Sequence, residues 1–249
     1  MTMQAFLVAL QFLTRLPVRL GTLPDDKTIG FSLIFYPLVG IILGALLLGF
    51  AELLSGASSL IAAALLVTAW VLLTGGLHLD GLADSADAWI GGMGSREKSL
   101  TIMKDPNCGP AGVVSIVLIL LLKFAALHTL LDTGDCIAIL LAATLGRTLL
   151  PLLFLTTPYV RANGLGSPLA NHLPRQACWV SIAVVPALML LLPDAHHLIV
   201  LPVVLMIFLL LQHLMLQRIG GTTGDTAGAL VEIGEAAVLL TAVMIQGEF

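Results

Sequence analysis

The chain has 249 residues, of which 58% are hydrophobic and only 10% are charged, and its formal net charge is −4. This composition, with a mean hydropathy of +1.05, excludes an ordinary soluble domain, in which roughly 25% of residues are charged. The negative net charge also gives no indication of nucleic-acid binding. Long uncharged stretches instead predict an all-α fold, a polytopic membrane helix bundle that forms a single integral-membrane domain over residues 1–249.

The first apolar segment, residues 1–13, has a small polar face formed by Gln4, Gln11 and Thr14. Such a face on an otherwise apolar helix predicts an N-terminal helix that lies in the membrane interface. A polar link over residues 15–28, with two prolines, follows it.

About seven transmembrane helices are expected after this link, because apolar stretches of span length alternate with Gly, Pro and polar turns. The expected spans cover approximately residues 33–53, 59–77, 112–131, 136–156, 177–192, 198–216 and 226–245. The turns near residues 55, 133 and 195 contain no Lys or Arg, whereas the connections on the other side are basic. By the positive-inside rule the basic side is cytoplasmic, which predicts a multi-pass membrane protein with that side facing the cytoplasm.

Three carboxylates, Asp80, Asp84 and Asp87, directly follow the second span. On a helix these positions lie within about 60° of one another. Acids crowded on one face repel each other unless a cation lies between them, and Mg²⁺ prefers carboxylate and phosphate oxygens. The pattern predicts a Mg²⁺ site on the cytoplasmic side. The alternative is a solvated, acid-rich loop.

Other residues on the same side suit a phosphorylated substrate. Lys104, beside Asp105, offers a cation to phosphate, although a loop lysine is commonly solvated. Tyr159 and Arg161 belong to a glycine-containing loop that suits an anion or a flat ring. His78, two residues before Asp80, is a candidate for proton transfer, or else an ordinary hydrogen-bonding residue.

Four charged residues, Lys123, Arg147, Glu232 and Glu235, fall inside expected spans. Intramembrane charges are costly, so they indicate either a function or pairing with one another. They would also suit the charge relay of an ion-coupled transporter. Against a transporter, the sequence shows no inverted repeat and its polar motifs gather on one side.

Six blocks of the sequence resemble the adenosylcobinamide-GDP ribazoletransferase family, also called cobalamin (5′-phosphate) synthases. They occur in the family's order along nearly the whole chain, and the Gly-Gly-Leu-His-Leu-Asp-Gly-Leu-Ala-Asp block is the most specific. The blocks are Phe12–Pro17, Phe35–Gly40, Gly75–Asp84, Ile102–Pro106, Gly220–Asp225 and Gly228–Glu235. The third block is also similar to the Asp-Gly-x-x-Ala core of CDP-alcohol phosphotransferases, but Asp84 stands where those enzymes have arginine.

The resemblance implies a Mg²⁺-dependent transferase of late cobalamin biosynthesis. In that reaction α-ribazole, or its 5′-phosphate, attacks adenosylcobinamide-GDP, and GMP leaves. We accordingly expect Asp80, Asp84, His78 and Lys104 to be catalytic, and Asp80, Asp84, Asp87 and Asp225 to hold the metal. Residues expected to bind substrate are Asp105, Arg147, Tyr159, Arg161, Glu232 and Glu235. The resemblance also implies a location in the bacterial inner membrane, with the active site facing the cytoplasm and other cobalamin-assembly enzymes as partners there.

Overall fold

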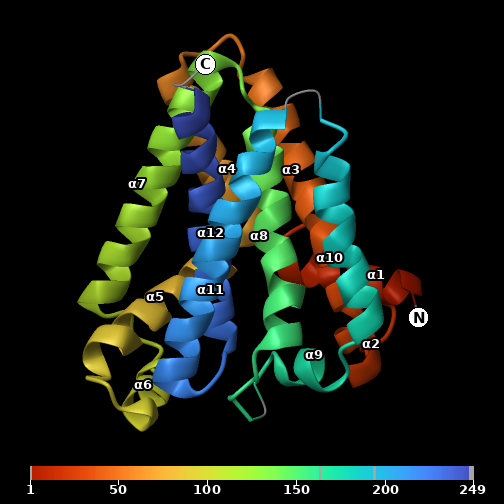
Figure 1. Cartoon of the computed structure of the whole chain (residues 1–249), viewed down its shortest axis with the longest axis vertical. Coiled ribbons are helices and arrows are strands. Elements are labelled where there is room, and N and C mark those ends of the chain that lie inside the picture. Colours follow the sequence, from red (N-terminus) through yellow and green to blue (C-terminus); the bar gives the residue numbers. More distant parts are fainter. Residues whose placement is uncertain (1, 163, 193–194, 247–249) are drawn as a thin grey trace.

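The apolar stretches form the helices of a bundle whose long axes run roughly parallel in the computed structural model (Figure 1). The structure describes residues 2–162, 164–192 and 195–246. These residues form no strand, and the one β-bridge among them joins Tyr159 to Thr222. The elements are α1 (Thr2–Leu13), α2 (Asp26–Ser32), η1 (Leu33–Phe35), α3 (Tyr36–Leu53), α4 (Ser59–Thr74), α5 (Leu77–Gly91), α6 (Arg96–Ile102), α7 (Pro110–Thr133), α8 (Ile137–Thr156), α9 (Ser167–Asn171), α10 (Arg175–Met189), η2 (Ala195–Ile199), α11 (Val200–Ile219) and α12 (Gly224–Gln246).

The all-helical membrane fold is confirmed, but the expected count of seven spans is not. Five helical segments of the described chain are long and apolar enough to cross a membrane, or six if the bent pair α4–α5 counts as one span. Helix α10 has only 15 residues, or about 22 Å at 1.5 Å per residue, against a hydrocarbon core of about 30 Å. The five segments are Asp26–Leu53, Pro110–Thr133, Ile137–Thr156, Ala195–Ile219 and Gly224–Ile245.

The second expected span does not run straight into the acidic residues. Helix α4 ends at Thr74, and α5 begins at Leu77 after a bend of 90°. Gly75 and Gly76 both adopt left-handed φ values, 67° and 69°, which glycine reaches without the steric cost of a Cβ atom. As a result α5 leaves the direction of α4 and crosses the lower end of the bundle (Figure 1).

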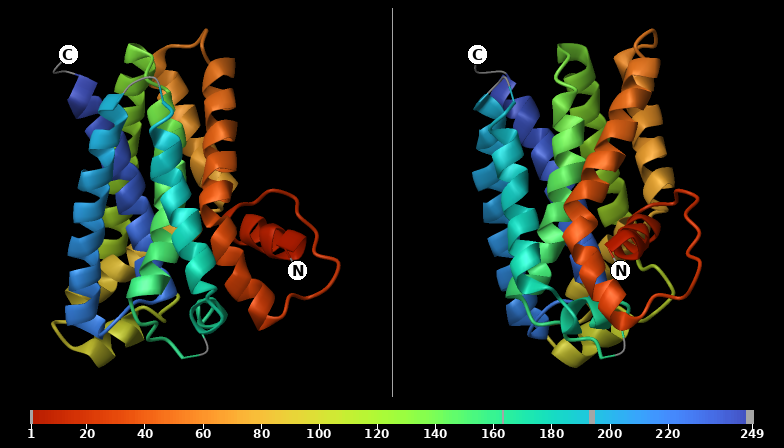
Figure 2. Two further views of the ribbon diagram at one scale, coloured as in Figure 1. Left: turned by 45° about the vertical axis from the view of Figure 1, so that its right-hand side comes forward. Right: turned by 90° about the vertical axis from the view of Figure 1, so that its right-hand side faces the viewer.

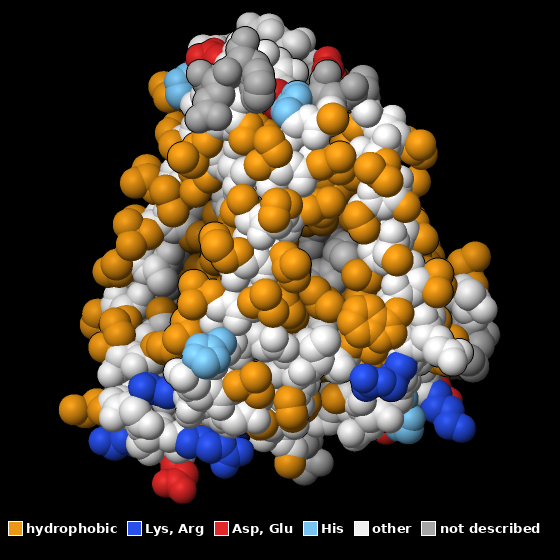
Figure 3. All heavy atoms as spheres, viewed as in Figure 1, with side chains coloured by type: hydrophobic (Ala, Val, Ile, Leu, Met, Phe, Trp, Pro, Cys, Tyr) orange, Lys and Arg blue, Asp and Glu red, His pale blue; other side chains and the backbone are white. Residues whose placement is uncertain are grey.

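Helix α1 lies beside the lower half of the bundle, across the direction of the long helices (Figure 2). Its polar residues turn toward the link that follows, since Gln4 donates to Thr22 Oγ1 and Gln11 to the carbonyl of Val18. This arrangement agrees with the interfacial helix expected from the sequence. On the face shown in Figure 3, Lys and Arg side chains gather at the lower end, as the sequence predicted.

The centre of the bundle is formed by α8 and α12. In the most apolar 18-residue stretch of each segment, 83% of the residues of α8 and 72% of those of α12 are buried inside the protein. The corresponding shares are 28% for α7 and 22% for the segment Ala195–Ile219, which includes α11. The two peripheral helices therefore present most of their apolar side chains outward. In a bilayer those side chains would contact lipid.

Four charged side chains lie together in this interior. Lys123 on α7 pairs with Glu232 and Glu235 on α12, and Arg147 on α8 pairs with Glu235. All four residues are buried, and the Lys123 ammonium also lies 5.1 Å from the ring centre of Trp70. Two positive charges balance two negative ones, so the network is neutral as a whole. This is the internal pairing that the sequence left open as an alternative to substrate binding.

Removing one charge from this network is expected to destabilise the bundle strongly. Arg147→Met leaves an excess negative charge in a low-dielectric interior, which should cost about 3–5 kcal/mol of unfolding free energy. Arg147→Met combined with Glu235→Gln restores neutrality, because Lys123 and Glu232 remain as a pair, and should be more stable than the single variant. The measurement is equilibrium unfolding in detergent micelles.

The matched control for this experiment is Arg19→Met, because Arg19 is exposed in the N-terminal link. Its unfolding free energy should stay within about 0.5 kcal/mol of the parent protein. Equal stabilities for Arg147→Met and Arg19→Met would show that the buried network does not hold the helices together.

Candidate functional site

Helix α5 carries the three acids predicted to bind metal. Residues 77–91 are helical, so the alternative of a solvated, acid-rich loop is wrong. Asp80 is exposed, whereas Asp84 and Asp87 are half-buried. The acids lie at the end of the bundle where α7 and α12 begin, because α5 crosses that end (Figure 1).

Asp225 joins this group through a close crossing of α5 and α12. A Cβ atom added at Gly81 would lie 2.7 Å from the carbonyl oxygen of Asp225, and one added at Gly228 would lie 3.2 Å from the Cα of His78. Only glycine permits such an approach of two backbones. The sequence separates Asp80 from Asp225 widely, and the crossing brings both to one cavity.

Asp225 is held in place by Arg161. The Arg161 Nη2 atom lies 2.9 Å from Asp225 Oδ2 and also donates to the carbonyl of Met103 at 3.1 Å. The loop that bears Arg161 is fixed in turn, because Val160 N donates to the carbonyl of Thr222 and Thr222 N to that of Pro158. The loop that bears Tyr159 and Arg161 and the segment Gly220–Asp225 are therefore paired side by side.

The acidic residues interact electrostatically. Partial burial, and then the charges of Asp80 and Asp225, raise the pKa of Asp84 from 3.8 to about 6, although the charge of Arg161 opposes this shift. A carboxyl group whose pKa is raised by neighbouring carboxylates favours a cation beside it. A donor set made only of carboxylate oxygens suits Mg²⁺.

The four acids do not converge as tightly as a closed metal cage. Among the described residues, the only group of three ligand side chains whose donor atoms all lie within 4.8 Å of one another is Asp135 with His196 and His197. Mg²⁺ usually keeps several waters and is shared with substrate phosphates, so an open arrangement of Asp80, Asp84 and Asp225 fits that ion.

Asp87 has a different set of contacts. Its carboxylate accepts hydrogen bonds from Gly109 N at 2.7 Å and from Gly112 N at 2.9 Å. These N–H groups belong to the first turn of α7 and have no partner within that helix. Asp87 thus links α5 to the start of α7. Its role as a metal ligand stays a prediction.

His78 is buried on α5, and its Nδ1 atom has no hydrogen-bond partner in the described part of the chain. Burial, and then the charges of Arg147 and Lys123, lower its pKa. The imidazole is therefore neutral, and the lowered pKa makes it a weak proton acceptor. Its predicted catalytic role stays a prediction.

Two cavities meet at this end of the bundle. The first, here called the acid cavity, has a volume of about 150 Å³, and its lining includes His78, Asp80 and Asp225. The second, here called the aromatic basin, measures about 700 Å³, and its lining includes Phe154, Tyr159 and Arg161. Phe154 lines both cavities, and the Arg161–Asp225 ion pair joins their walls.

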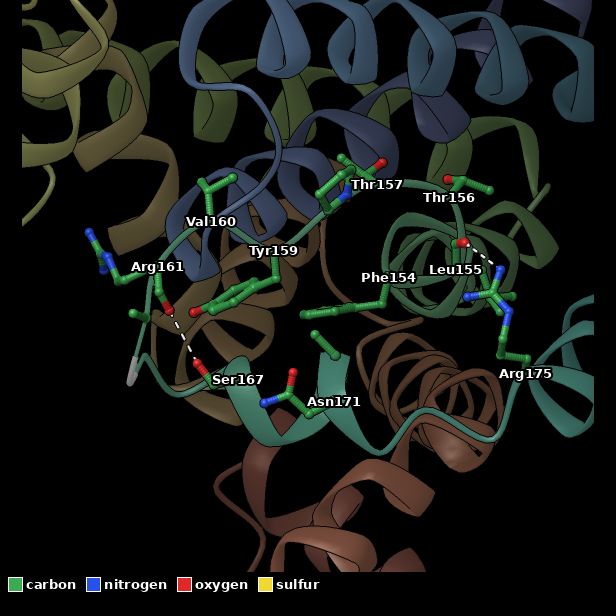
Figure 4. Close-up of a pocket in the computed structure, with 13 residues that line it drawn as sticks. Phe154, Leu155, Thr156, Thr157, Tyr159, Val160, Arg161, Ser167, Asn171 and Arg175 are labelled. Atoms are coloured by element: carbon green, nitrogen blue, oxygen red, sulfur yellow. Dashed lines mark hydrogen bonds between the residues drawn. The ribbon is translucent and has the colours of Figure 1, made fainter.

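Figure 4 shows how the aromatic basin is built. The rings of Phe154 and Tyr159 are stacked with centres 5.9 Å apart, and Arg161 and Arg175 lie on opposite sides of them. Burial raises the pKa of Tyr159, so its hydroxyl is protonated at neutral pH. A flat aromatic wall between two guanidinium groups suits a nucleotide, whose base can stack while its phosphate meets a cation.

Several predicted site residues lie elsewhere. Lys104 and Asp105 are exposed on the loop before α7, and Asp105 accepts two hydrogen bonds from Asn107. Three further residues form buried ion pairs inside the bundle and line neither cavity: Arg147, Glu232 and Glu235. Their predicted contact with substrate stays a prediction. Sequence reasoning did not select Phe154 or Arg175 for the site, because Phe154 belongs to an apolar span and Arg175 stood out only as one more basic residue.

Comparisons with known proteins agree on one family. The family model described as cobalamin-5-phosphate synthase matches residues 5–243. The adenosylcobinamide-GDP ribazoletransferase of Pseudomonas syringae pv. tomato is 54% identical over 98% of this chain and 100% of its own length. The protein of the same name from Pseudomonas aeruginosa is 53% identical over 96% of this chain and 97% of its own length. No solved structure matches the chain.

The α5–α12 crossing can be tested by overpacking it. Gly81→Ala places a methyl group against the backbone of Asp225, which cannot move away without shifting α12. We expect a loss of about 1–3 kcal/mol in unfolding free energy, measured in detergent micelles, together with faster amide hydrogen exchange across residues 77–91.

Gly49→Ala is the matched control, because Gly49 also lies within a helix but a Cβ atom there meets nothing within 4 Å. This variant should match or slightly exceed the parent in stability. If Gly81→Ala behaves like Gly49→Ala, the close approach of α5 and α12 is not a constraint.

Proposed function

Because the chain belongs to the cobalamin-5-phosphate synthase family, we propose that it joins α-ribazole, or α-ribazole 5′-phosphate, to adenosylcobinamide-GDP and releases GMP. The product is adenosylcobalamin or its 5′-phosphate. The observation that carries this proposal is the 54% identity to adenosylcobinamide-GDP ribazoletransferases over 98% of the chain. The adjoining acid cavity and aromatic basin supply chemistry that suits the reaction.

In the proposed reaction a ribose hydroxyl oxygen attacks the phosphorus atom nearer the cobinamide. A new P–O bond forms there, the P–O bond to GMP breaks, and the hydroxyl loses its proton. Asp80 and Asp84 would hold Mg²⁺, with Asp225 and Asp87 beside them. When bound, Mg²⁺ would neutralise charge on the diphosphate.

Residues of the two cavities would bind the substrates and accept the proton. Arg161 lines the aromatic basin and pairs with Asp225 of the acid cavity, and it would bind phosphate oxygens. Phe154 and Tyr159 would stack against a base in the aromatic basin, whose volume of about 700 Å³ falls in the usual range for small-molecule sites. The proton would pass to a carboxylate of the acid cavity or to the neutral ring of His78, while Lys104 would approach from the exposed loop.

The two alternatives drawn from the sequence gain no support from the comparisons, which name neither a transporter nor a CDP-alcohol phosphotransferase. The intramembrane charges that suggested a transporter form ion pairs with one another. We propose further that the protein resides in the inner membrane with the acid cavity facing the cytoplasm, where both substrates would be supplied. Association with other cobalamin-assembly enzymes is a further proposal, testable by pull-down from membranes.

The metal-site proposal predicts that GMP formation depends on Asp80 and Asp84. Protein reconstituted in nanodiscs would be given adenosylcobinamide-GDP, α-ribazole and a Mg²⁺ series. Asp80→Asn and Asp84→Asn should each lower the rate at least about 100-fold, as loss of a group that stabilises the transition state does, and should raise the Mg²⁺ concentration needed for half-maximal rate.

Asp132→Asn is the control, since Asp132 is an exposed acid at the far end of α7. Near-parental rates for both Asp80→Asn and Asp84→Asn would refute the metal site. Absence of GMP formation by the parent protein at any Mg²⁺ concentration would refute the transferase function itself.

The orientation can be read from Cys108, which is exposed and immediately precedes Gly109, the residue whose N–H contacts Asp87. In a Cys136→Ser background, a membrane-impermeant maleimide should label Cys108 in inside-out vesicles and leave it unlabelled in spheroplasts. Cys178 is buried and should stay unlabelled in both. Labelling of Cys108 in spheroplasts would place the acid cavity on the outer side.

A further inference from the structure

A second group of potential metal ligands lies at the opposite end of the bundle from the acid cavity. Asp135 lies in the turn after α7, and His196 and His197 lie in η2 at the start of α11. Helix α7 begins beside Asp87 and ends at Thr133, so its far end is the end away from the acids. From this group we propose a transition-metal site, with Zn²⁺ as the ion that its donors fit best.

The three side chains already approach the spacing that a tetrahedral ion requires. Each offers one donor atom, and these atoms all lie within 4.8 Å of one another. The His197 Nε2 atom is 3.6 Å from Asp135 Oδ1. Zinc–ligand bonds of about 2.0–2.2 Å in tetrahedral geometry place two donor atoms about 3.3–3.6 Å apart. The pair therefore stands at the separation of two zinc ligands.

The donor chemistry distinguishes this site from the acid cavity. Two imidazoles and one carboxylate suit Zn²⁺ and related transition ions, whereas Mg²⁺ takes oxygen ligands almost exclusively. His197 is buried, and Asp135 and His196 are half-buried, so an ion could enter from the extramembrane end. Three protein ligands leave one position for water.

A bound ion would connect segments that are distant in the sequence. Asp135 lies in the turn between α7 and α8, and the two histidines lie just before α11. Coordination of one ion by all three would therefore link that turn to the start of α11. The rings of His196 and His197 are already adjacent, with centres 4.1 Å apart. Binding to the folded state alone would raise its stability.

The experiment uses full-length protein in detergent with no affinity tag. It would be incubated with ZnCl₂, desalted and assayed for metal by mass spectrometry, and its unfolding temperature would be followed with zinc and with excess EDTA. We expect one zinc per chain and a rise in unfolding temperature that EDTA reverses. Asp135→Asn and His196→Ala should each lose the bound zinc and the temperature rise.

His213→Ala is the matched control, because His213 is exposed on α11 toward the acid-cavity end and its loss should leave one zinc bound. Both ligand variants alter half-buried residues, and metal-free unfolding temperatures close to that of the parent would show that they fold. No retained zinc in the parent, or equal zinc in the parent and in Asp135→Asn, would overturn the proposal. GMP formation is not part of the readout, so the outcome is independent of the proposed function.

Discussion

At Gly81, helix α5 approaches α12 so closely that an added Cβ atom would lie 2.7 Å from the carbonyl oxygen of Asp225. This approach exists only because α4 stops at Thr74 and the left-handed pair Gly75–Gly76 bends the chain by 90°. A straight helix would have carried Asp80 and Asp84 away from Asp225. The bend and the crossing together make one cavity from residues that the chain places far apart.

The same helix α12 links this cavity to the buried charges. Asp225 lies in its first turn, and Glu232 and Glu235 follow on the next turns, paired with Lys123 and Arg147. These pairs oppose sliding or rotation of α12 relative to α7 and α8, because any displacement would separate charges in a low-dielectric interior. The network therefore fixes the position of α12 along its axis, and with it the point at which Asp225 lies against α5. The costly intramembrane charges thus have a structural role.

Much of this organisation could be predicted from sequence, since hydropathy alone indicates an all-helical membrane fold and the spacing of Asp80, Asp84 and Asp87 predicts a shared helix face. The bend before α5 could not be predicted as a right angle, because a Gly-Gly pair permits many backbone conformations. The aromatic basin was missed for a different reason. Phe154 is one apolar residue among many in its span. Its role depends on the hydrogen bonds between Thr222 and the loop after α8, which hold Tyr159 against the Phe154 ring.

The acids of the site differ in how far their charge is already compensated. Asp87 accepts two N–H groups of α7, whose positive dipole end favours a carboxylate, and Asp225 pairs with Arg161. In the described part of the chain, no hydrogen bond or ion pair involves the side chains of Asp80 or Asp84. Partial burial, and then the neighbouring acids, raise the pKa of Asp84. The proposed Mg²⁺ site therefore rests first on Asp80 and Asp84. The hydrogen bonds of Asp87 hold α5 against the start of α7, and the close backbone approach at Gly81 holds α5 against α12. Both contacts fix the helix that carries the two uncompensated carboxylates, of which Asp80 lines the acid cavity.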